Sequence, residues 1–305
     1  MIRTLQASDG PDVVSLLSWM DGAPEREVFA PDARTPDDLV LENAGKTCLV
    51  AADDLGSVTA FAALSPFQDG LLLEGPLSEA PDTLHRLLGE ALKHNDNQSV
   101  YAFAARDNLP VRSALEAVSF TAMHSTDFYR LTRDQLSRLP KLSALPDGLS
   151  LSDTTDSQTY RSLYRASEDT WSERLHWSEA QLQSHLHSPD VELTVLLRGG
   201  RAPGFRAPGF RAPGFRALGF AELEFDGELA RMTYLAVHPA ERGQGHGRQL
   251  LLRAAHAAFA HPEVSALQLR AHDHEGAARS LYAHAGFSHS RSVVTYLLEP
   301  EGEEA

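Results

Sequence analysis

One stretch, Thr233 to Leu252, constrains the fold of this chain most, because three local signals follow one another in it. A short apolar run, Leu235 to Val237, ends at His238-Pro239, and proline cannot donate to a sheet ladder. Three glycines follow at alternate positions, and behind them apolar side chains recur at helical spacing: Leu250, Leu251, Ala254, Ala255, Ala258 and Phe259. This order predicts a strand, a glycine-rich turn and a helix.

The turn itself, with Gly243, Gly245 and Gly247, is suited to an anion. Glycines let the backbone approach a ligand closely, and the first N–H groups of the following helix have no partner within the helix. Such a helix start favours a phosphate or a diphosphate, and Arg242 and Arg248 add charge-assisted contacts. The pattern is neither a Walker loop, since no Gly-Lys-Ser/Thr follows, nor the Rossmann Gly-x-Gly-x-x-Gly.

Two motifs carry a resemblance to a known family. Arg242 to Gly247 (Arg-Gly-Gln-Gly-His-Gly) resembles the acetyl-CoA signature of the GNAT (Gcn5-related N-acetyltransferase) superfamily, Arg/Gln-x-x-Gly-x-Gly/Ala. Downstream, Ala277 to Phe287 is similar to the closing helix of the family and the Gly-Phe that follows it. Taken alone, the first motif also fits a glycine-rich hairpin beside a helix, but the two motifs together favour the family.

The resemblance implies an α/β (α+β) fold, in which a mixed, mostly antiparallel twisted sheet is flanked by helices. Two strands splay apart and acetyl-CoA lies in the gap, with its pantetheine arm paired to the backbone of Leu235, Ala236 and Val237. Asparagine usually stands where this chain has Glu275, which weakens that one contact. The implied cofactor-binding residues are Leu235, Ala236, Val237, Arg242, Gly243, Gln244, Gly245, His246, Gly247, Arg248, Glu275, Ala278 and Tyr282.

The implied reaction is direct transfer of an acetyl (acyl) group from acetyl-CoA to a primary amine of a small molecule. It needs a base, donors for the developing oxyanion, and an acid near the departing thiolate. Tyr282 stands where the family places that acid, and a phenol with a pKa near 10 can protonate a thiolate whose thiol has a pKa near 8.5. The alternative is that Tyr282 is a core residue that packs its helix on the sheet.

The base is less well defined. Many relatives carry a glutamate on the strand that leads to the phosphate loop, but Ala230 to Thr233 contains no carboxylate. Glu222 and Glu224 alternate along the preceding strand and therefore share one face, so we expect the base among them. Other residues could act through water, although each is also explained as a solvated polar residue: Glu228, His238, His272, His274 and Glu275.

No metal is expected. His272-Asp-His-Glu275 places two histidines beside carboxylates, but it lacks a partner motif, and GNAT chemistry needs no metal. Cys48 is the only cysteine, which excludes an internal disulfide and a cysteine zinc site.

The same layout occurs twice along the chain, which indicates an internal duplication. Ile2–Leu5 and the helix that follows correspond to Leu149–Ser152 and its helix, while Leu115 stands where the second half has Tyr282. We predict a degenerate GNAT-like domain at residues 1–135, a linker at 136–148 and an acetyl-CoA-binding domain at 149–305. This layout resembles tandem GNAT proteins, including the mycothiol synthase group, whose C-terminal copy is catalytic.

The N-terminal copy lacks the phosphate loop. Its corresponding segment, Gly75 to Asp82, has no alternating glycines and contains Glu79 and Asp82, which would repel a diphosphate. We therefore expect this half to be structural, or to contribute walls of the acceptor pocket. Further expected elements are a hairpin at 47–52 and 57–64, helices at 83–92 and 109–118, strands at 71–74, 99–105, 193–198 and 220–225, and two helices within 167–187.

Trp171 and Trp177 lie in that last helical region, which covers the acceptor pocket in GNAT proteins. They could line a substrate site, but aromatic residues at helical spacing are also typical of a core.

Four copies of a pentapeptide, Arg-Ala-Pro/Leu-Gly-Phe, occupy residues 201–220. The last copy continues into a predicted strand, so the first three, residues 201–215, are expected to be an insertion at a hairpin tip. The insertion either extends the hairpin neutrally into solvent or forms an arm that covers the active site or a partner subunit. The second alternative would use Phe205, Phe210 and Phe215, because exposed phenylalanines usually pack on something.

The formal net charge of −15 argues against nucleic acid or an anionic membrane as a partner and is compatible with a cationic amine. The chain shows neither a signal peptide nor a run of about 18 apolar residues, so we expect a cytoplasmic protein, monomeric or homodimeric. Two other functions stay open: a protein that binds acetyl-CoA without turnover, and a thiol-biosynthesis acetyltransferase resembling mycothiol synthase.

Overall fold

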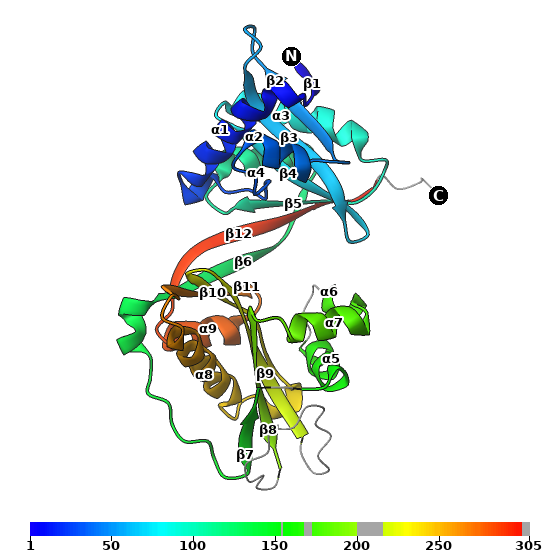
Figure 1. The fold of residues 1–305 in the computed structure, drawn as a ribbon. Coiled ribbons are helices and arrows are strands. Elements are labelled where there is room, and N and C mark those ends of the chain that lie inside the picture. Colours follow the sequence, from blue (N-terminus) through cyan, green and yellow to red (C-terminus); the bar gives the residue numbers. More distant parts are fainter. Residues whose placement is uncertain (154, 168–172, 200–215, 301–305) are drawn as a thin grey trace. The chain divides into compact units, whose positions relative to one another are not determined.

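The computed structural model describes residues 1–153, 155–167, 173–199 and 216–300, and the chain forms two compact units (Figure 1). The first comprises Met1–Asp127, His272–His274 and Arg291–Ala305, and the second comprises Phe128–Ala271 and Glu275–Ser290. Each unit has a mixed sheet with helices packed on it, so the predicted α/β fold class is confirmed.

The sheet of the first unit has the strand order β1-β2-β3-β4-β5-β12. Its strands are β1 (Ile2–Thr4), β2 (Thr47–Ala52), β3 (Val58–Phe67), β4 (Gly70–Ser78), β5 (Val100–Ala105) and β12 (Ser288–Leu298). Its helices are α1 (Gly10–Asp21), α2 (Pro36–Glu42), α3 (Pro81–Ala91) and α4 (Leu109–Ala117), with short 3-10 helices η1 (Ala7–Asp9), η2 (Pro24–Arg26) and η3 (Leu92–His94). The described neighbours pair antiparallel, except β4 and β5, which are parallel.

The sheet of the second unit has the order β11-β10-β9-β8-β7. Its strands are β7 (Leu149–Ser152), β8 (Val191–Arg198), β9 (Arg216–Asp226), β10 (Leu229–Val237) and β11 (Ala266–His272). Its helices are α5 (Ser157–Ala166), α6 (Glu173–His176), α7 (Glu179–Leu186), α8 (His246–Ala260) and α9 (Gly276–His284), with η4 (Arg133–Arg138) and η5 (Pro239–Glu241). Here too one pair, β10 and β11, is parallel and the other described pairs are antiparallel.

The two units repeat one succession of elements, as the sequence predicts for a duplication. Each has an edge strand, a helical segment, a three-strand meander, a helix, a strand parallel to the third strand of that meander, and another helix. Leu115 and Tyr282 hold the same place, the seventh residue of α4 and of α9.

The compact units do not follow the linear boundaries expected from the sequence. Val293–Leu298 of β12 pair antiparallel with Val100–Ala105 of β5, so the end of the chain joins the first unit. β6 (Thr121–Thr132) likewise contributes Thr121–Asp127 to the first unit and Phe128–Thr132 to the second. Pairing between strands far apart in sequence leaves no signal in a linear pattern, which is why the expected limits differ from the observed ones.

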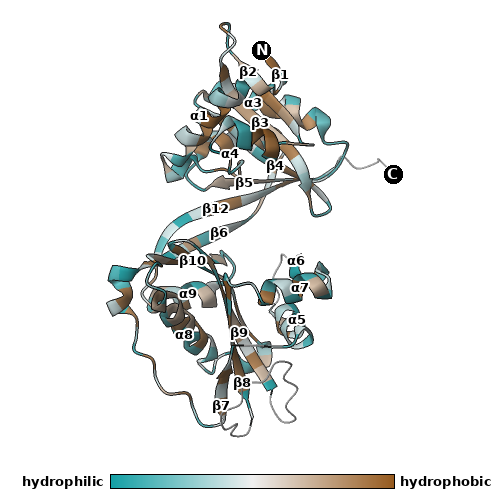
Figure 2. Ribbon diagram, in the orientation of Figure 1, coloured by the Kyte–Doolittle hydropathy of each residue, from teal (hydrophilic) through white to brown (hydrophobic). Residues whose placement is uncertain are grey.

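The second unit has two cores, because its sheet is covered on both faces. The first core lies between α8 and β9, and Figure 2 draws α8 largely in hydrophobic colours. It contains Leu250, Leu251 and Phe259 of α8 and Leu218 and Leu223 of β9. The second core contains Tyr160 and Tyr164 of α5, Leu182 of α7, and Val195 and Phe220 of the sheet. A strand buried on both faces reads as a continuous apolar run, and Glu222 interrupts that run in β9.

Candidate functional site

The parallel strands of the second unit separate after three residue pairs. Leu229–Arg231 of β10 pair with Ala266–Gln268 of β11, and a bulge follows between Met232 and Tyr234. Beyond the bulge β10 runs on to Val237, paired with β9 on one side, and no pairing with β11 is described on the other. Leu235, Ala236 and Val237 therefore lie beyond the point where the two parallel strands separate.

The glycine-rich turn follows directly. After η5, Gly243 and Gly245 have φ angles of +76° and +81°, which L side chains rarely adopt, so glycine is needed at both positions. Gly245 is the N-cap of α8 and has no side chain with which to cap the helix. The first amides of a helix have no partner within the helix, so they suit a ligand. Arg242, Gln244 and Arg248 are exposed around the turn, whereas His246 is buried.

The two family-like motifs meet at this turn. A Cβ built on Gly247 would lie 3.6 Å from Cδ2 of Leu281 and 3.7 Å from Cγ2 of Val237, so the end of β10, the start of α8 and the face of α9 are in contact. Ala278 packs against the same core, and Glu275 is the exposed N-cap residue of α9. The predicted cofactor residues thus lie around one strand end and two helices.

Tyr282 is 5% exposed and lies next to Leu281 on α9. Its ring centroid is 5.6 Å from that of Tyr129 and 6.4 Å from that of Phe287. Burial raises the pKa of the Tyr282 hydroxyl above its usual value, and the negative charge of Glu275 raises it further. The phenol therefore stays protonated across the neutral range, as a proton donor must be.

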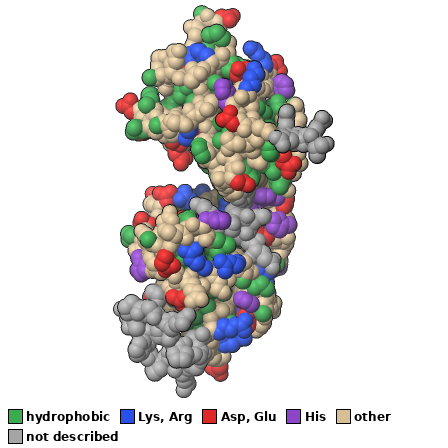
Figure 3. Space-filling model, turned by 90° about the vertical axis from the view of Figure 1, so that its right-hand side faces the viewer, with side chains coloured by type: hydrophobic (Ala, Val, Ile, Leu, Met, Phe, Trp, Pro, Cys, Tyr) green, Lys and Arg blue, Asp and Glu red, His purple; other side chains and the backbone are tan. Residues whose placement is uncertain are grey.

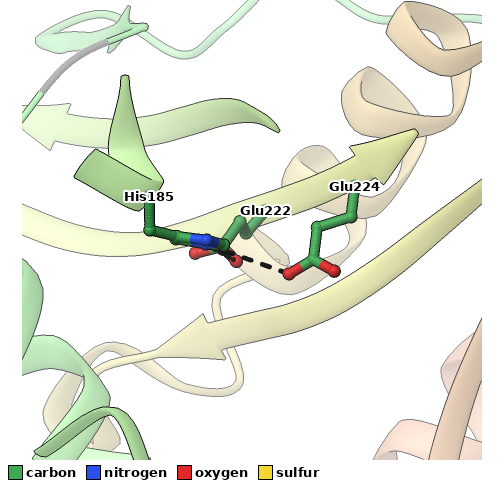
Figure 4. A group of neighbouring side chains, drawn as sticks. All are labelled: His185, Glu222 and Glu224. Atoms are coloured by element: carbon green, nitrogen blue, oxygen red, sulfur yellow. Dashed lines mark hydrogen bonds and ion pairs between the residues drawn. The ribbon is translucent and has the colours of Figure 1, made fainter. Parts of the chain in front are cut away.

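The predicted acidic pair lies beside His185 of α7 (Figure 4). Glu222 is fully buried, and its carboxylate accepts hydrogen bonds from the Tyr160 hydroxyl at 2.7 Å and the Thr233 hydroxyl at 3.0 Å. Nε2 of His185 lies 3.1 Å from the same carboxylate. Arg174 pairs with Glu222 and also with Glu224, at 2.7 Å, so one guanidinium bridges both carboxylates.

This environment argues against Glu222 as the catalytic base. Burial raises the pKa of its carboxyl, but the hydrogen bond from His185 and the charge and hydrogen bond of Arg174 outweigh burial and lower the pKa to about 2. A carboxylate with so low a pKa accepts a proton poorly near pH 7. Glu222 is instead the anchor of a buried network.

Sequence reasoning missed the partners of Glu222, among them Arg174 and His185. The guanidinium of Arg174 stacks 4.5 Å from the ring centroid of Tyr234 and 5.2 Å from that of Trp177. The His185 ring lies edge-on to Trp177, at 5.1 Å. Neither residue belongs to a motif, and only the packing of α6 and α7 on the sheet brings them to Glu222.

Trp177 is therefore part of the second core, while Trp171 lies outside the described residues. The first three pentapeptides, residues 201–215, also lie outside them. β9 begins at Arg216, four residues before the strand start expected at Phe220, so the whole last copy belongs to the strand.

His185, Glu222 and Glu224 have ligand atoms within 4.8 Å of one another, the geometry of a metal site. The guanidinium of Arg174 already supplies the positive charge between the two carboxylates. A metal ion would bring a second positive charge to the same place, so Glu222 and Glu224 do not suit one. Within the described part of the chain, residues 272–275 form no comparable group.

The remaining base candidates do not join the acidic pair. His238 binds locally, its Nδ1 accepting from the Ala240 amide at 3.3 Å, and Glu228 is exposed in the turn between β9 and β10. His272 and His274 belong to the first unit, where Nδ1 of His272 lies 3.0 Å from the Thr126 hydroxyl.

In the first unit the parallel strands β4 and β5 also separate, but another segment of the chain lies between them. β4 and β5 pair only over Leu71–Leu73 and Val100–Ala102. Beyond these pairs lies the segment 27–29, with Val28 bridged antiparallel to Ala104. The carbonyl of Phe29 accepts from Gly75 N at 2.7 Å, its amide donates to the Phe103 carbonyl at 3.1 Å, and the Glu27 carbonyl accepts from Ala105 N at 2.7 Å.

One face of the second unit carries a group of positively charged side chains. On the face of the second unit drawn in Figure 3, Lys and Arg side chains gather although the net charge of the chain is −15. None of the helices in the described residues is long and apolar enough to cross a membrane.

Comparison with known proteins defines the class of this fold. Residues 214–289 match the family described as acetyltransferase (GNAT) domain. A GCN5-related N-acetyltransferase from Sphaerobacter thermophilus is 16% identical, with a TM-score of 0.70 over 100% of this chain and 97% of that one. No curated protein sequence matches the chain.

Two further solved structures share the architecture. A tandem GNAT protein from the clavulanic acid biosynthesis pathway is 15% identical, with a TM-score of 0.63 over 100% of this chain and 99% of that one. A GNAT-family acetyltransferase from Colwellia psychrerythraea is 15% identical, with a TM-score of 0.54 over 98% and 100%. Residues 214–289 therefore resemble a GNAT acetyltransferase domain, and the chain as a whole has the fold of these solved structures, one of which is a tandem GNAT protein.

Proposed function

We propose that this protein is an N-acetyltransferase that transfers the acetyl group of acetyl-CoA to a primary amine of a small molecule. The observation that supports this most is the convergence in one unit of an unpaired strand edge, an uncapped helix start and a buried tyrosine. The edge is β10 beyond its bulge, the helix is α8, and the tyrosine is Tyr282.

The cofactor roles follow from this geometry. The amides from Gly243 to Gly247, with Arg242 and Arg248 beside them, would bind the diphosphate, because an uncapped helix start favours an anion. The backbone of Leu235 to Val237 would pair with the pantetheine arm. Tyr282 would protonate the departing thiolate of coenzyme A, since burial keeps its hydroxyl protonated.

For the base we propose Glu224, the other member of the predicted pair. Its side chain is 34% exposed, so unlike Glu222 it can reach an incoming amine or a water. Nε2 of His185 lies 3.9 Å from Glu224, and this histidine is the second candidate. Comparing Glu224→Gln with His185→Gln assigns the base, because only replacement of the true base should lower kcat by about 10²-fold.

The N-terminal unit would bind no cofactor. The splay that would hold a pantetheine arm is occupied by the segment 27–29, whose backbone already bonds to β4 and β5. We further propose that the protein acts in the cytoplasm without a metal, as a monomer or a homodimer.

The test has two stages. Calorimetric titration with coenzyme A establishes binding, and thiol release over a panel of amines, including a cysteinyl amine, establishes turnover and acceptor class. Binding without thiol release would instead support the non-catalytic alternative, which the engagement of Glu222 by Arg174 favours. Activity confined to the cysteinyl amine would support the thiol-biosynthesis alternative.

A further inference from the structure

The turn that we assign to the cofactor diphosphate contains a buried carboxylate. Glu241 ends η5, directly before Arg242, and is 4% exposed. A carboxylate at this place would repel a diphosphate, and a buried charge without a partner is strongly unfavourable. Its partners therefore decide whether the turn can accept an anion.

Those partners are two arginines from the β8–β9 hairpin. Nη1 of Arg198 lies 2.9 Å from one carboxylate oxygen of Glu241, and Nη1 of Arg216 lies 3.1 Å from the other. Arg198 is the last residue of β8, Arg216 is the first of β9, and the two are register partners. Like charges directly opposite each other destabilise a strand pair, so Glu241 also relieves their repulsion.

The Arg198 guanidinium also contacts the glycine turn itself. Its Nη2 donates to Oε1 of Gln244 at 3.2 Å and lies 3.4 Å from Nε2 of His246. Gln244 and His246 stand on either side of Gly245, the N-cap residue of α8. One guanidinium thus holds Glu241 and both neighbours of the N-cap glycine.

We propose that Arg198 and Arg216 are positioning residues of the coenzyme A site that act through Glu241. We call the three residues the ionic clamp. The ionic clamp fixes the diphosphate-binding turn to the β8–β9 hairpin, and its two positive charges outweigh the Glu241 carboxylate. The inference rests on the proposed function, because it assumes that the turn binds the cofactor diphosphate.

The test is a double-mutant cycle read by calorimetry. We expect Arg198→Ala and Arg216→Ala each to raise the Kd of coenzyme A by about tenfold, because each leaves Glu241 undercompensated beside the diphosphate. In a Glu241→Gln background, the same arginine substitutions should raise the Kd of coenzyme A by less than about threefold, because no carboxylate remains to be compensated. Arg231→Ala is the matched control, since Arg231 is 45% exposed, like Arg198 at 44%, and pairs with Asp226 instead.

A second probe separates positioning from loss of structure. Pantetheine has the arm of the cofactor but no phosphate, so its Kd should stay unchanged in the arginine variants. A parallel rise in the Kd of both ligands would overturn the proposal, because it would indicate general damage. Thermal unfolding without ligand checks each variant, and Arg198→Lys, which keeps the charge, should recover part of the affinity.

The cycle can contradict the clamp in two more ways. Equal costs of Arg198→Ala in the unsubstituted protein and in the Glu241→Gln background would mean that Arg198 contacts the phosphates directly. No cost in either background would mean that the clamp has no role in binding. If the unsubstituted protein binds no coenzyme A, the proposed function fails first and the inference fails with it.

Discussion

The Thr233 hydroxyl donates to Oε1 of Glu222 at 3.0 Å, which brings a carboxylate of β9 to the bulge of β10. The sequence shows no carboxylate on β10 in the approach to the glycine turn. The neighbouring strand supplies one at that point, but Arg174 neutralises it. We therefore propose that Glu222 organises the site rather than taking a proton.

Replacing Glu222 should change stability and its pH dependence. Its pKa of about 2 lies below the unfolded value of 4.5, so the ionised network stabilises the fold above about pH 4.5, and this contribution is lost as the pH falls toward 2. The contribution is about 3 kcal/mol. Glu222→Gln should lower the free energy of unfolding by about 3 to 5 kcal/mol at pH 7 and less at pH 3, measured by urea denaturation.

Glu228→Gln is the control for that experiment, because Glu228 is exposed in the turn between β9 and β10. An equal loss of stability at pH 7 and pH 3 in Glu222→Gln would show that the ionised carboxylate is not what stabilises the network.

Tyr282→Phe should lower kcat by about 10²-fold and leave the Kd of coenzyme A unchanged, because the hydroxyl acts on the departing thiolate only. Burial raises the pKa of Tyr282, so the wild-type rate should show no loss from its ionisation below about pH 10. Stopped-flow measurement of thiol release over pH 6 to 10 checks both points, with Tyr129→Phe as a control from the neighbouring ring. Unchanged thiol release in Tyr282→Phe would remove Tyr282 from the mechanism.

Gly245→Ala should weaken coenzyme A binding beyond the backbone strain it causes. Gly227 has a positive φ as well, +56° against +81°, and a Cβ on either glycine meets nothing within 4 Å. Both substitutions therefore strain the backbone by about 1 kcal/mol. Only Gly245 lies where the proposed diphosphate must approach. Gly245→Ala should therefore raise the Kd of coenzyme A, measured by calorimetry, about tenfold more than Gly227→Ala does. Equal effects would contradict the assignment of the turn.

Calorimetry should find one coenzyme A per chain. The segment 27–29 occupies the splay of the first unit, and the amides of Phe29, Gly75 and Ala105 are already bonded. Two equivalent sites per chain, or residual tight binding after Gly245→Ala, would show that the first unit binds cofactor.

Deletion of residues 201–215 should leave the fold and the cofactor site intact. The β8–β9 register already reaches Arg198 opposite Arg216, so the deletion leaves Gly199-Gly200 as a two-residue turn, for which Gly-Gly is well suited. We expect a Tm within about 4 °C of the full chain and a Kd of coenzyme A within about twofold. Loss of amine turnover with binding preserved would instead identify the repeats as an arm over the active site.

Local patterns in the sequence determined the elements that bear on the cofactor. Proline after Val237, alternating glycines and the apolar spacing from Leu250 specify a strand, a turn and a helix, since each acts on the backbone within a few residues. The duplication could be predicted because the same local patterns occur in both halves. The lack of a phosphate loop in the first half could be predicted because Gly75 to Asp82 has no alternating glycines.

Only the tertiary structure decided what the charged residues do. Glu222 looked like a base because β9 puts it on one face with Glu224, yet Arg174 and His185 arrive from helices much earlier in the chain and hold it ionised. The pairing of β12 with β5 and the segment 27–29 between β4 and β5 were likewise invisible. The pKa of a side chain and the partner of a strand edge depend on neighbours that are close in space but distant in sequence, and no local pattern encodes them.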